Sequence, residues 1–121
     1  MVEHDPMEIW NSILETIAMA AEEAGIQVAD LTCMGLDNQG ETVMLWDRYT
    51  GVPVYNAIVW QDRRTAKMAD ELAEKYGDLI RERTGLVADA YFSATKIRWI
   101  MDHGGESQGE DRERPCDCRH A

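Results

Sequence analysis

Residues 55–65 read Tyr55-Asn56-Ala57-Ile58-Val59-Trp60-Gln61-Asp62-Arg63-Arg64-Thr65, an apolar run followed at once by a charged one. The apolar run, residues 54–60, is typical of a buried strand. Beyond the charged residues, five side chains recur on one face of an expected helix: Ala66, Ala69, Leu72, Ala73 and Tyr76. Gly77 is expected to end that helix, and a short helical turn over residues 78–83 follows it. The order of strand and helix is typical of α/β and α+β domains.

Two further apolar runs precede this stretch, at residues 31–36 and 42–46. The turn sequence Asn38-Gln39-Gly40 separates these two runs, and residues 47–51 form a second turn before the run at 54–60. We therefore expect three strands that tight turns join into a mostly antiparallel ribbon.

Helices are expected on both sides of this ribbon. The first one begins after Asp5, which can cap it, has Pro6 at its first position and ends at Gly25. Its apolar face is expected to pack on the sheet and contains Trp10, Ile13, Leu14, Ile17 and Ala21. Towards the end of the chain, Ser93 is expected to cap a last helix that includes residues 96–101.

The chain of 121 residues is strongly acidic, with 23 Asp and Glu against 12 Lys and Arg and a formal net charge of −11. This charge repels phosphate backbones and anionic membrane surfaces, so we expect neither nucleic-acid nor membrane partners. No apolar run reaches the roughly 20 residues of a membrane span, and the first residues lack the features of a secretory signal. The three cysteines make no disulfide framework. These features favour a reduced, cytoplasmic protein of one domain at most.

The composition changes at residue 104, where a run of Gly, charged and polar residues begins. Because residues 104–115 have no apolar side chain to pack, residues 104–121 are expected to form a disordered tail behind a domain over residues 1–103. Cys116, Cys118 and His120 are residue types that bind zinc, but three ligands without a fourth or a scaffold argue against a site. The abrupt change is also consistent with a tail that is read out of frame.

Six groups of residues within 2–103 stand out together: Val2-Glu3-His4-Asp5-Pro6 with Ile9-Trp10, Asn38-Gln39 with Glu41-Thr42, Trp46-Asp47, the stretch from Tyr55 to Thr65, Thr84-Gly85-Leu86-Val87, and Tyr91-Phe92-Ser93-Ala94-Thr95-Lys96. In their order and spacing these runs resemble glycerol kinase. The family, the FGGY carbohydrate kinases, has two actin-like domains of ribonuclease-H-like topology. It uses ATP and Mg2+ to phosphorylate a hydroxyl of glycerol or a related polyol or sugar. The resemblance implies an α/β chain that is part of the N-terminal domain, with mostly antiparallel strands and flanking helices.

The resemblance assigns four positions to the substrate pocket: Gly40, Glu41, Trp60 and Tyr91. It implies that Glu41 accepts hydrogen bonds from substrate hydroxyls and that Trp60 packs against the substrate carbons. Tyr91 would contribute its hydroxyl. Gly40 stands where the family has Arg, so a polyol other than glycerol is expected to fit. Residues 62–64, Asp-Arg-Arg, are expected to be helix-start and surface charges rather than site residues.

The same four positions have plainer interpretations when the resemblance is set aside. Glu41 would be a solvated carboxylate in a turn, Trp60 would belong to the core, and Tyr91 could be either core or site. Gly40 would be explained by the backbone conformation of a turn alone.

The resemblance also indicates what the chain lacks. The family's Asp-x-Gly-Thr phosphate-binding turn and its catalytic Asp within Gly-Asp-Gln are not in the sequence, so no residue is assigned to catalysis, cofactor or metal binding. The isolated chain is expected to be inactive, whereas the complete family enzyme needs ATP and Mg2+ and could be a homo-oligomer. A second hypothesis stays open: a non-catalytic, standalone acidic domain that acts as an interaction module, or a truncated, inactive gene product.

Overall fold

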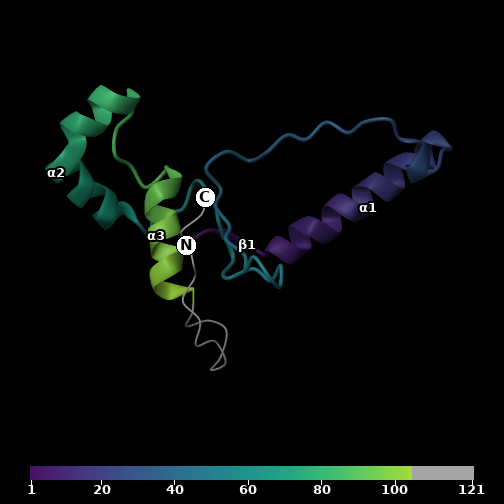
Figure 1. Cartoon of the computed structure of the whole chain (residues 1–121), viewed down its shortest axis with the longest axis horizontal. Helices are drawn as coiled ribbons and strands as arrows, with labels where there is room; N and C mark the ends of the chain where they lie inside the picture. Colours follow the sequence, from purple (N-terminus) through teal and green to yellow (C-terminus); the bar gives the residue numbers. More distant parts are fainter. Residues whose placement is uncertain (105–121) are drawn as a thin grey trace.

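The computed structural model describes residues 1–104. In chain order they form β1 (Glu3–His4), α1 (Pro6–Ala24), the 3-10 helix η1 (Val28–Asp30), β2 (Ala57–Ile58), α2 (Ala66–Thr84) and α3 (Ser93–His103). The strands and α3 lie at the centre, and α1 and α2 extend from it in opposite directions (Figure 1). Apart from Gly104, the expected tail with Cys116, Cys118 and His120 lies outside the described residues.

The small sheet is antiparallel, as expected for an α/β chain of this kind. β1 pairs with β2, so that Glu3 lies opposite Ile58 and His4 opposite Ala57. On the other side of β2, Val43 and Ile58 exchange two backbone hydrogen bonds of 2.9 and 2.8 Å. The segment around Ile58 therefore has a hydrogen-bonded neighbour along both of its edges, and the side chain of Ile58 is buried against Val43 and Ile100.

The expected strand at residues 31–36 is wrong. These residues belong to the long connection that returns from the end of α1 to the centre without running beside residues 42–46 (Figure 1). A stable strand needs a hydrogen-bonded partner and one buried face. Leu31, Met34 and Leu36 are all exposed, so this segment is apolar in composition but has no buried face.

The expected hairpin between residues 42–46 and 54–60 is confirmed in its turn and its hydrogen bonds, although the pairing consists of isolated bridges. The amide of Val54 donates to the carbonyl of Leu45 at 2.8 Å. In the turn, one carboxylate oxygen of Asp47 accepts hydrogen bonds from the amides of Tyr49 and Thr50, at 3.0 and 2.7 Å. This is the local backbone bonding that makes Asp a good turn residue.

α1 begins and ends where the sequence predicts. Asp5 is its N-cap and accepts a hydrogen bond of 2.7 Å from the amide of Met7, Pro6 is its first residue, and Gly25 closes it in the left-handed conformation. The expectation that its apolar face packs on the sheet is wrong for the described residues. Trp10 and Leu14 are about half exposed, and of the whole helix only Ala21 is buried. Within residues 1–104, no helix has both the length and the apolarity to cross a membrane.

α2 is longer than the sequence predicts, since it continues through Gly77 to Thr84 as one helix. A glycine inside a helix costs only about 1 kcal/mol relative to alanine, and the residues after it are mostly good helix formers. Arg81 and Arg83 lie in the last turn, where positive charge interacts favourably with the helix dipole. The true stop is Gly85, which takes the left-handed conformation of a C-cap.

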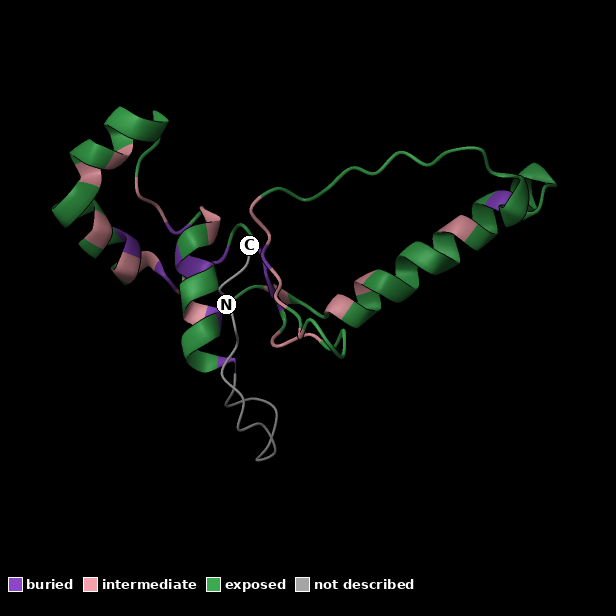
Figure 2. Cartoon of the chain, in the orientation of Figure 1, coloured by how far each residue is buried: buried purple, intermediate pink, exposed green. Residues whose placement is uncertain are grey.

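The core is small and central. Val43, Ile58 and Ile100 form it, and Leu45, Val54, Tyr55 and Trp99 pack against it half buried. Figure 2 shows the buried residues gathered around α3 and the segment that leads from β2 to α2, while α1 and α2 are largely exposed. The polar side chains described below lie around this same centre.

Candidate functional site

The start of α3 brings together three of the four residues that the sequence assigns to a substrate site. Glu41, Trp60 and Tyr91 lie with Ser93 and Lys96 in one group, which we call the Glu41 cluster. The rings of Trp60 and Tyr91 meet edge to face, with centroids 6.0 Å apart. Trp60 is 38% exposed and Tyr91 41% exposed, so both aromatic rings present surface on which a ligand can pack.

Ser93 connects α3 to the side chain of Glu41. It is the first residue of the helix, and Phe92 occupies the cap position without a side-chain hydrogen bond, so the expectation that Ser93 caps the helix is wrong. Its hydroxyl instead donates to Oε2 of Glu41 at 2.5 Å. A carboxylate has about four acceptor sites, so Glu41 retains acceptor capacity for hydroxyls of a ligand.

Glu41 itself has an unusual backbone conformation, with a φ of 60°. For a residue with a Cβ, the left-handed region costs about 1–2 kcal/mol, so the surrounding structure must hold Glu41 there. Gly40, next to it, is not in that region. A Cβ at position 40 would meet no other atom within 4 Å. Backbone conformation therefore does not explain the glycine, and the plainer interpretation of Gly40 is wrong.

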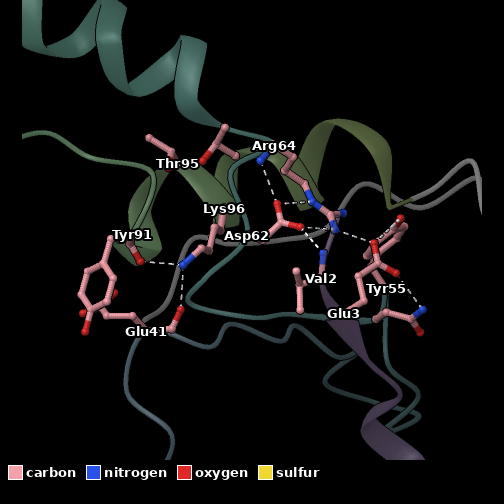
Figure 3. Close-up of polar contacts among 11 residues, drawn as sticks. Val2, Glu3, Glu41, Tyr55, Asp62, Arg64, Tyr91, Thr95 and Lys96 are labelled. Carbon is pink, nitrogen blue, oxygen red and sulfur yellow. Dashed lines mark hydrogen bonds and ion pairs between the residues drawn. The ribbon is translucent and has the colours of Figure 1, made fainter.

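Lys96 is the member of the Glu41 cluster that the sequence did not single out. Its side chain is fully buried, and Nζ donates to the main-chain carbonyl oxygens of Glu41 at 2.9 Å and Tyr91 at 2.6 Å. In Figure 3 its amino group lies between these two residues. Burial lowers the pKa of Lys96 from its ordinary value, an effect that nearby carboxylates oppose only in part.

A second polar group, the Arg64 cluster, consists of Val2, Glu3, Tyr55, Asp62 and Arg64. Arg64 donates from Nε to Oδ1 of Asp62 at 2.8 Å and pairs through Nη2 with Oε1 of Glu3 at 2.6 Å. The amide of Val2 donates to Oδ2 of Asp62 at 2.5 Å. Figure 3 shows these contacts joining the start of the chain to the segment after β2. The cluster therefore fastens β1 to the residues that lead into α2.

The expectation that Asp62 and Arg64 are surface charges is wrong, while for Arg63 it is confirmed. The side chains of Asp62 and Arg64 are 0% and 5% exposed, whereas Arg63 is 60% exposed and forms an ion pair of 2.6 Å with Asp89. The guanidinium of Arg64 also lies over the ring of Trp99, 4.6 Å from its centroid. Within residues 1–104, Nη1 of Arg64 is buried without a hydrogen-bond partner.

The Arg64 cluster makes stability depend on pH. Burial alone would raise the pKa of Asp62, but hydrogen bonds from the side chain and amide of Arg64 and from the amide of Val2 outweigh it, so the pKa lies well below 3.8. Glu3 is likewise shifted below 4.5, since hydrogen bonds from Asn56, Arg64 and Tyr55 outweigh its burial. A carboxyl group with a lowered folded-state pKa contributes stability above its unfolded pKa and loses it as the pH falls.

We therefore expect the free energy of unfolding to be level near neutral pH and to fall steadily below about pH 4.5. Urea denaturation of the 121-residue chain between pH 7 and pH 2 measures this dependence. In Asp62→Asn the dependence should be weaker, because the substituted side chain cannot titrate. An equal loss of stability with acid in both chains would show that Asp62 is not its source.

The described residues offer no place for a metal ion. Within residues 1–104, no group of three or more His, Cys, Asp or Glu side chains could hold one. A shallow hollow lies elsewhere on the surface, between the start of α1 and the segment from Val52 to Asn56. It shares no residue with the Glu41 cluster.

Comparison with known proteins agrees with this architecture. Residues 1–110 match the model of the N-terminal domain of the FGGY family of carbohydrate kinases. The chain therefore belongs to the FGGY family of carbohydrate kinases.

Within that family the chain is similar to glycerol kinases. It is 62% identical over 103 residues to glycerol kinase 2 of Thermotoga maritima, a match that covers 84% of this chain and 21% of that protein. It is 56% identical over 115 residues to glycerol kinase 1 of Lactiplantibacillus plantarum, covering 93% of this chain and 23% of that one. The chain thus spans about a fifth of the length of the curated relatives that it matches.

A solved structure supports the same assignment. The crystal structure of Plasmodium falciparum glycerol kinase with ADP superimposes with a TM-score of 0.77 at 37% identity, covering 86% of this chain and 21% of that one. This likeness confirms the expected fold class, a partial actin-like domain of ribonuclease-H-like topology.

Proposed function

We propose that this chain supplies the substrate-binding side of an ATP-dependent kinase that phosphorylates a hydroxyl of a small polyol or sugar. The observation that carries the proposal is the Glu41 cluster. Glu41, Trp60 and Tyr91 come from three separate segments, and the start of α3 gathers them in one place. A carboxylate beside two half-exposed aromatic rings is the combination that binds a polyol, which has hydroxyls on an apolar carbon chain.

Each side chain has a distinct task in this proposal. Glu41, whose Oε2 is already bonded to Ser93, accepts hydrogen bonds from one or two adjacent substrate hydroxyls. Trp60 packs against the carbon chain, and the hydroxyl of Tyr91 bonds to the substrate as well. Together they hold the reacting hydroxyl in a fixed direction, and such positioning is the main contribution a kinase makes besides stabilising charge.

We assign no residue of this chain to the binding of ATP or Mg2+. No described group fits Mg2+, and the residues of the Glu41 cluster suit hydroxyls rather than phosphate groups. We propose that ATP and Mg2+ are bound by other parts of the complete enzyme and that the isolated chain is inactive.

A cytoplasmic enzyme without nucleic-acid or membrane partners fits the net charge of −11, and the complete enzyme could be a homo-oligomer.

The proposed function is tested in a chimaera, in which a related kinase supplies the parts that this chain does not contain. Residues 2–104 of this chain replace the matching segment of glycerol kinase 2 of Thermotoga maritima, and ADP release is measured with a panel of polyols and sugars. The proposal predicts turnover that depends on the added polyol. A folded chimaera that releases no ADP with any member of the panel would contradict it, and would leave the interaction-module hypothesis as the better one.

Gly40 provides a prediction about which polyol is preferred. Because a side chain at position 40 meets no neighbour within 4 Å, Gly40→Arg should be accommodated and should place a donor beside Glu41. A charge-assisted hydrogen bond contributes about 1.5–3 kcal/mol, so kcat/KM for glycerol should rise about tenfold or more in the chimaera relative to longer polyols. Gly35→Arg is the matched control, since it is exposed and equally open. An equal effect of both substitutions would refute this role for position 40.

A further inference from the structure

Lys96 is unusual because its charge is buried and, among residues 1–104, no carboxylate lies at hydrogen-bond distance from it. The side chain is 0% exposed, and its two acceptors are neutral main-chain carbonyl oxygens. Burying an ammonium group is costly unless it is well bonded, and a methionine of similar shape would pack at this position without that cost. Contribution to stability alone is therefore a weak explanation for a lysine here.

The two carbonyl groups that Lys96 contacts belong to two of the proposed substrate-binding residues. One is that of Glu41, which is held in the left-handed region, and the other is that of Tyr91, fifty positions away along the chain. Lys96 and Ser93 lie one helical turn apart in α3 and bond the main chain and the side chain of Glu41 respectively. One end of α3 thus fixes both the backbone and the carboxylate of Glu41.

Two other hydrogen bonds hold Tyr91 and Trp60 in place, but neither of them joins the main chain of Glu41 to that of Tyr91. The amide of Tyr91 donates to Oδ1 of Asp89 at 2.7 Å, which anchors Tyr91 to its own loop. The amide of Trp60 donates to the hydroxyl of Thr42 at 3.3 Å, which links Trp60 to the segment of Glu41. The side chain of Lys96 bonds to the main chain of Glu41 and to the main chain of Tyr91 at once.

We propose that Lys96 is a positioning residue for the substrate site: its ammonium group holds the main chains of Glu41 and Tyr91 at the spacing that lets their side chains bind one polyol. The inference rests on the proposed function, since it takes Glu41 and Tyr91 as substrate-binding residues. Lys96 does not touch the substrate in this account. It acts by setting the distance between the residues that do.

The first experiment uses the 121-residue chain labelled with 5-fluorotryptophan, in which the fluorine resonance of Trp60 reports on the cluster. In Lys96→Met this resonance should shift or broaden, because the two segments around Trp60 lose their common bond. The matched control is Thr95→Val, a neighbouring position in α3, which removes a buried hydrogen bond to Thr65 and leaves the bonds of Lys96 to Glu41 and Tyr91 in place. An unchanged Trp60 resonance in Lys96→Met would overturn the proposal.

A second measurement on the unsubstituted chain covers the case in which Lys96→Met does not fold. The ammonium nitrogen of Lys96 should be protected from proton exchange and should show couplings across hydrogen bonds to the carbonyl carbons of Glu41 and Tyr91. Lys67 and Lys75 are exposed and serve as internal controls. Rapid exchange at all three lysines would overturn the proposal.

The kinetic experiment uses the chimaera described above. We expect Lys96→Met to raise KM for the polyol about tenfold or more and to leave KM for ATP within about twofold, because a spacing error affects polyol binding first. Thr95→Val should lower the melting temperature and leave both KM values unchanged. A lower melting temperature with an unchanged polyol KM in Lys96→Met would overturn the proposal. If the unsubstituted chimaera has no polyol kinase activity, the proposed function fails, and the two measurements on the chain still decide whether Lys96 holds the segments together.

Discussion

Arg64→Met is expected to lower the free energy of unfolding of the chain by about 3–5 kcal/mol. The substitution leaves Asp62, which is fully buried, with an uncompensated charge, and removing one partner from a buried ion pair has an effect of this size. It also removes the ion pair to Glu3, so β1 should be held less firmly to the residues after β2. Urea denaturation followed by circular dichroism measures the loss.

Arg98→Met is the matched control, because Arg98 forms an ion pair of 2.8 Å with Asp102 on the exposed side of α3. Surface pairs of this kind contribute between zero and about 1 kcal/mol. If Arg64→Met and Arg98→Met shift the midpoint equally, the Arg64 cluster does not hold β1 in place. The double variant Arg64→Met with Asp62→Leu should recover part of the stability, since neither charge is then left buried.

Glu41→Gln is expected to reduce kcat/KM for the polyol about 100-fold in the chimaera. The substitution keeps the size of the side chain and one oxygen acceptor, and it removes the charge that makes hydrogen bonds to substrate hydroxyls strong. Stability should change little, because an amide can still accept the hydrogen bond from Ser93. The measurement is steady-state ADP release against polyol concentration.

The control for this variant is Glu71→Gln, because Glu71 is an exposed carboxylate on α2 that belongs to neither the Glu41 cluster nor the Arg64 cluster. It should leave kcat/KM within about twofold. A Glu41→Gln enzyme with normal kcat/KM would show that Glu41 is the solvated turn carboxylate of the plainer interpretation.

Local chemistry made some elements predictable from the sequence. The cap at Asp5, the proline after it and the glycine at position 25 determine both ends of α1. Asp47 and Gly51 likewise determine the hairpin turn, because the Asp47 side chain bonds to the local backbone and Gly51 has a φ of 70°. These features depend on neighbours within a few residues, which is why the sequence displays them.

The remaining features depend on contacts between distant segments. Asp62 and Arg64 look like helix-start charges in sequence. Residues about sixty positions earlier bond to them, and Trp99 of α3 packs against Arg64. Lys96 is similar, since its two acceptors lie in a turn and a loop whose positions the sequence does not specify. The burial of Lys96 could have been predicted from the sequence, because Lys96 lies in the same helix as the apolar Ile100 and one turn before it.

The assignment of the Glu41 cluster to the substrate site is tested most directly by asking whether a polyol contacts Trp60. The chimaera is labelled with 5-fluorotryptophan and titrated, without ATP, with the polyol that supports turnover. We predict a saturable shift of the Trp60 resonance, with half-saturation near the KM of that polyol, and no shift at the exposed Trp10. A Trp60 resonance that stays unchanged at polyol concentrations that saturate turnover would contradict the assignment of the Glu41 cluster to the substrate site.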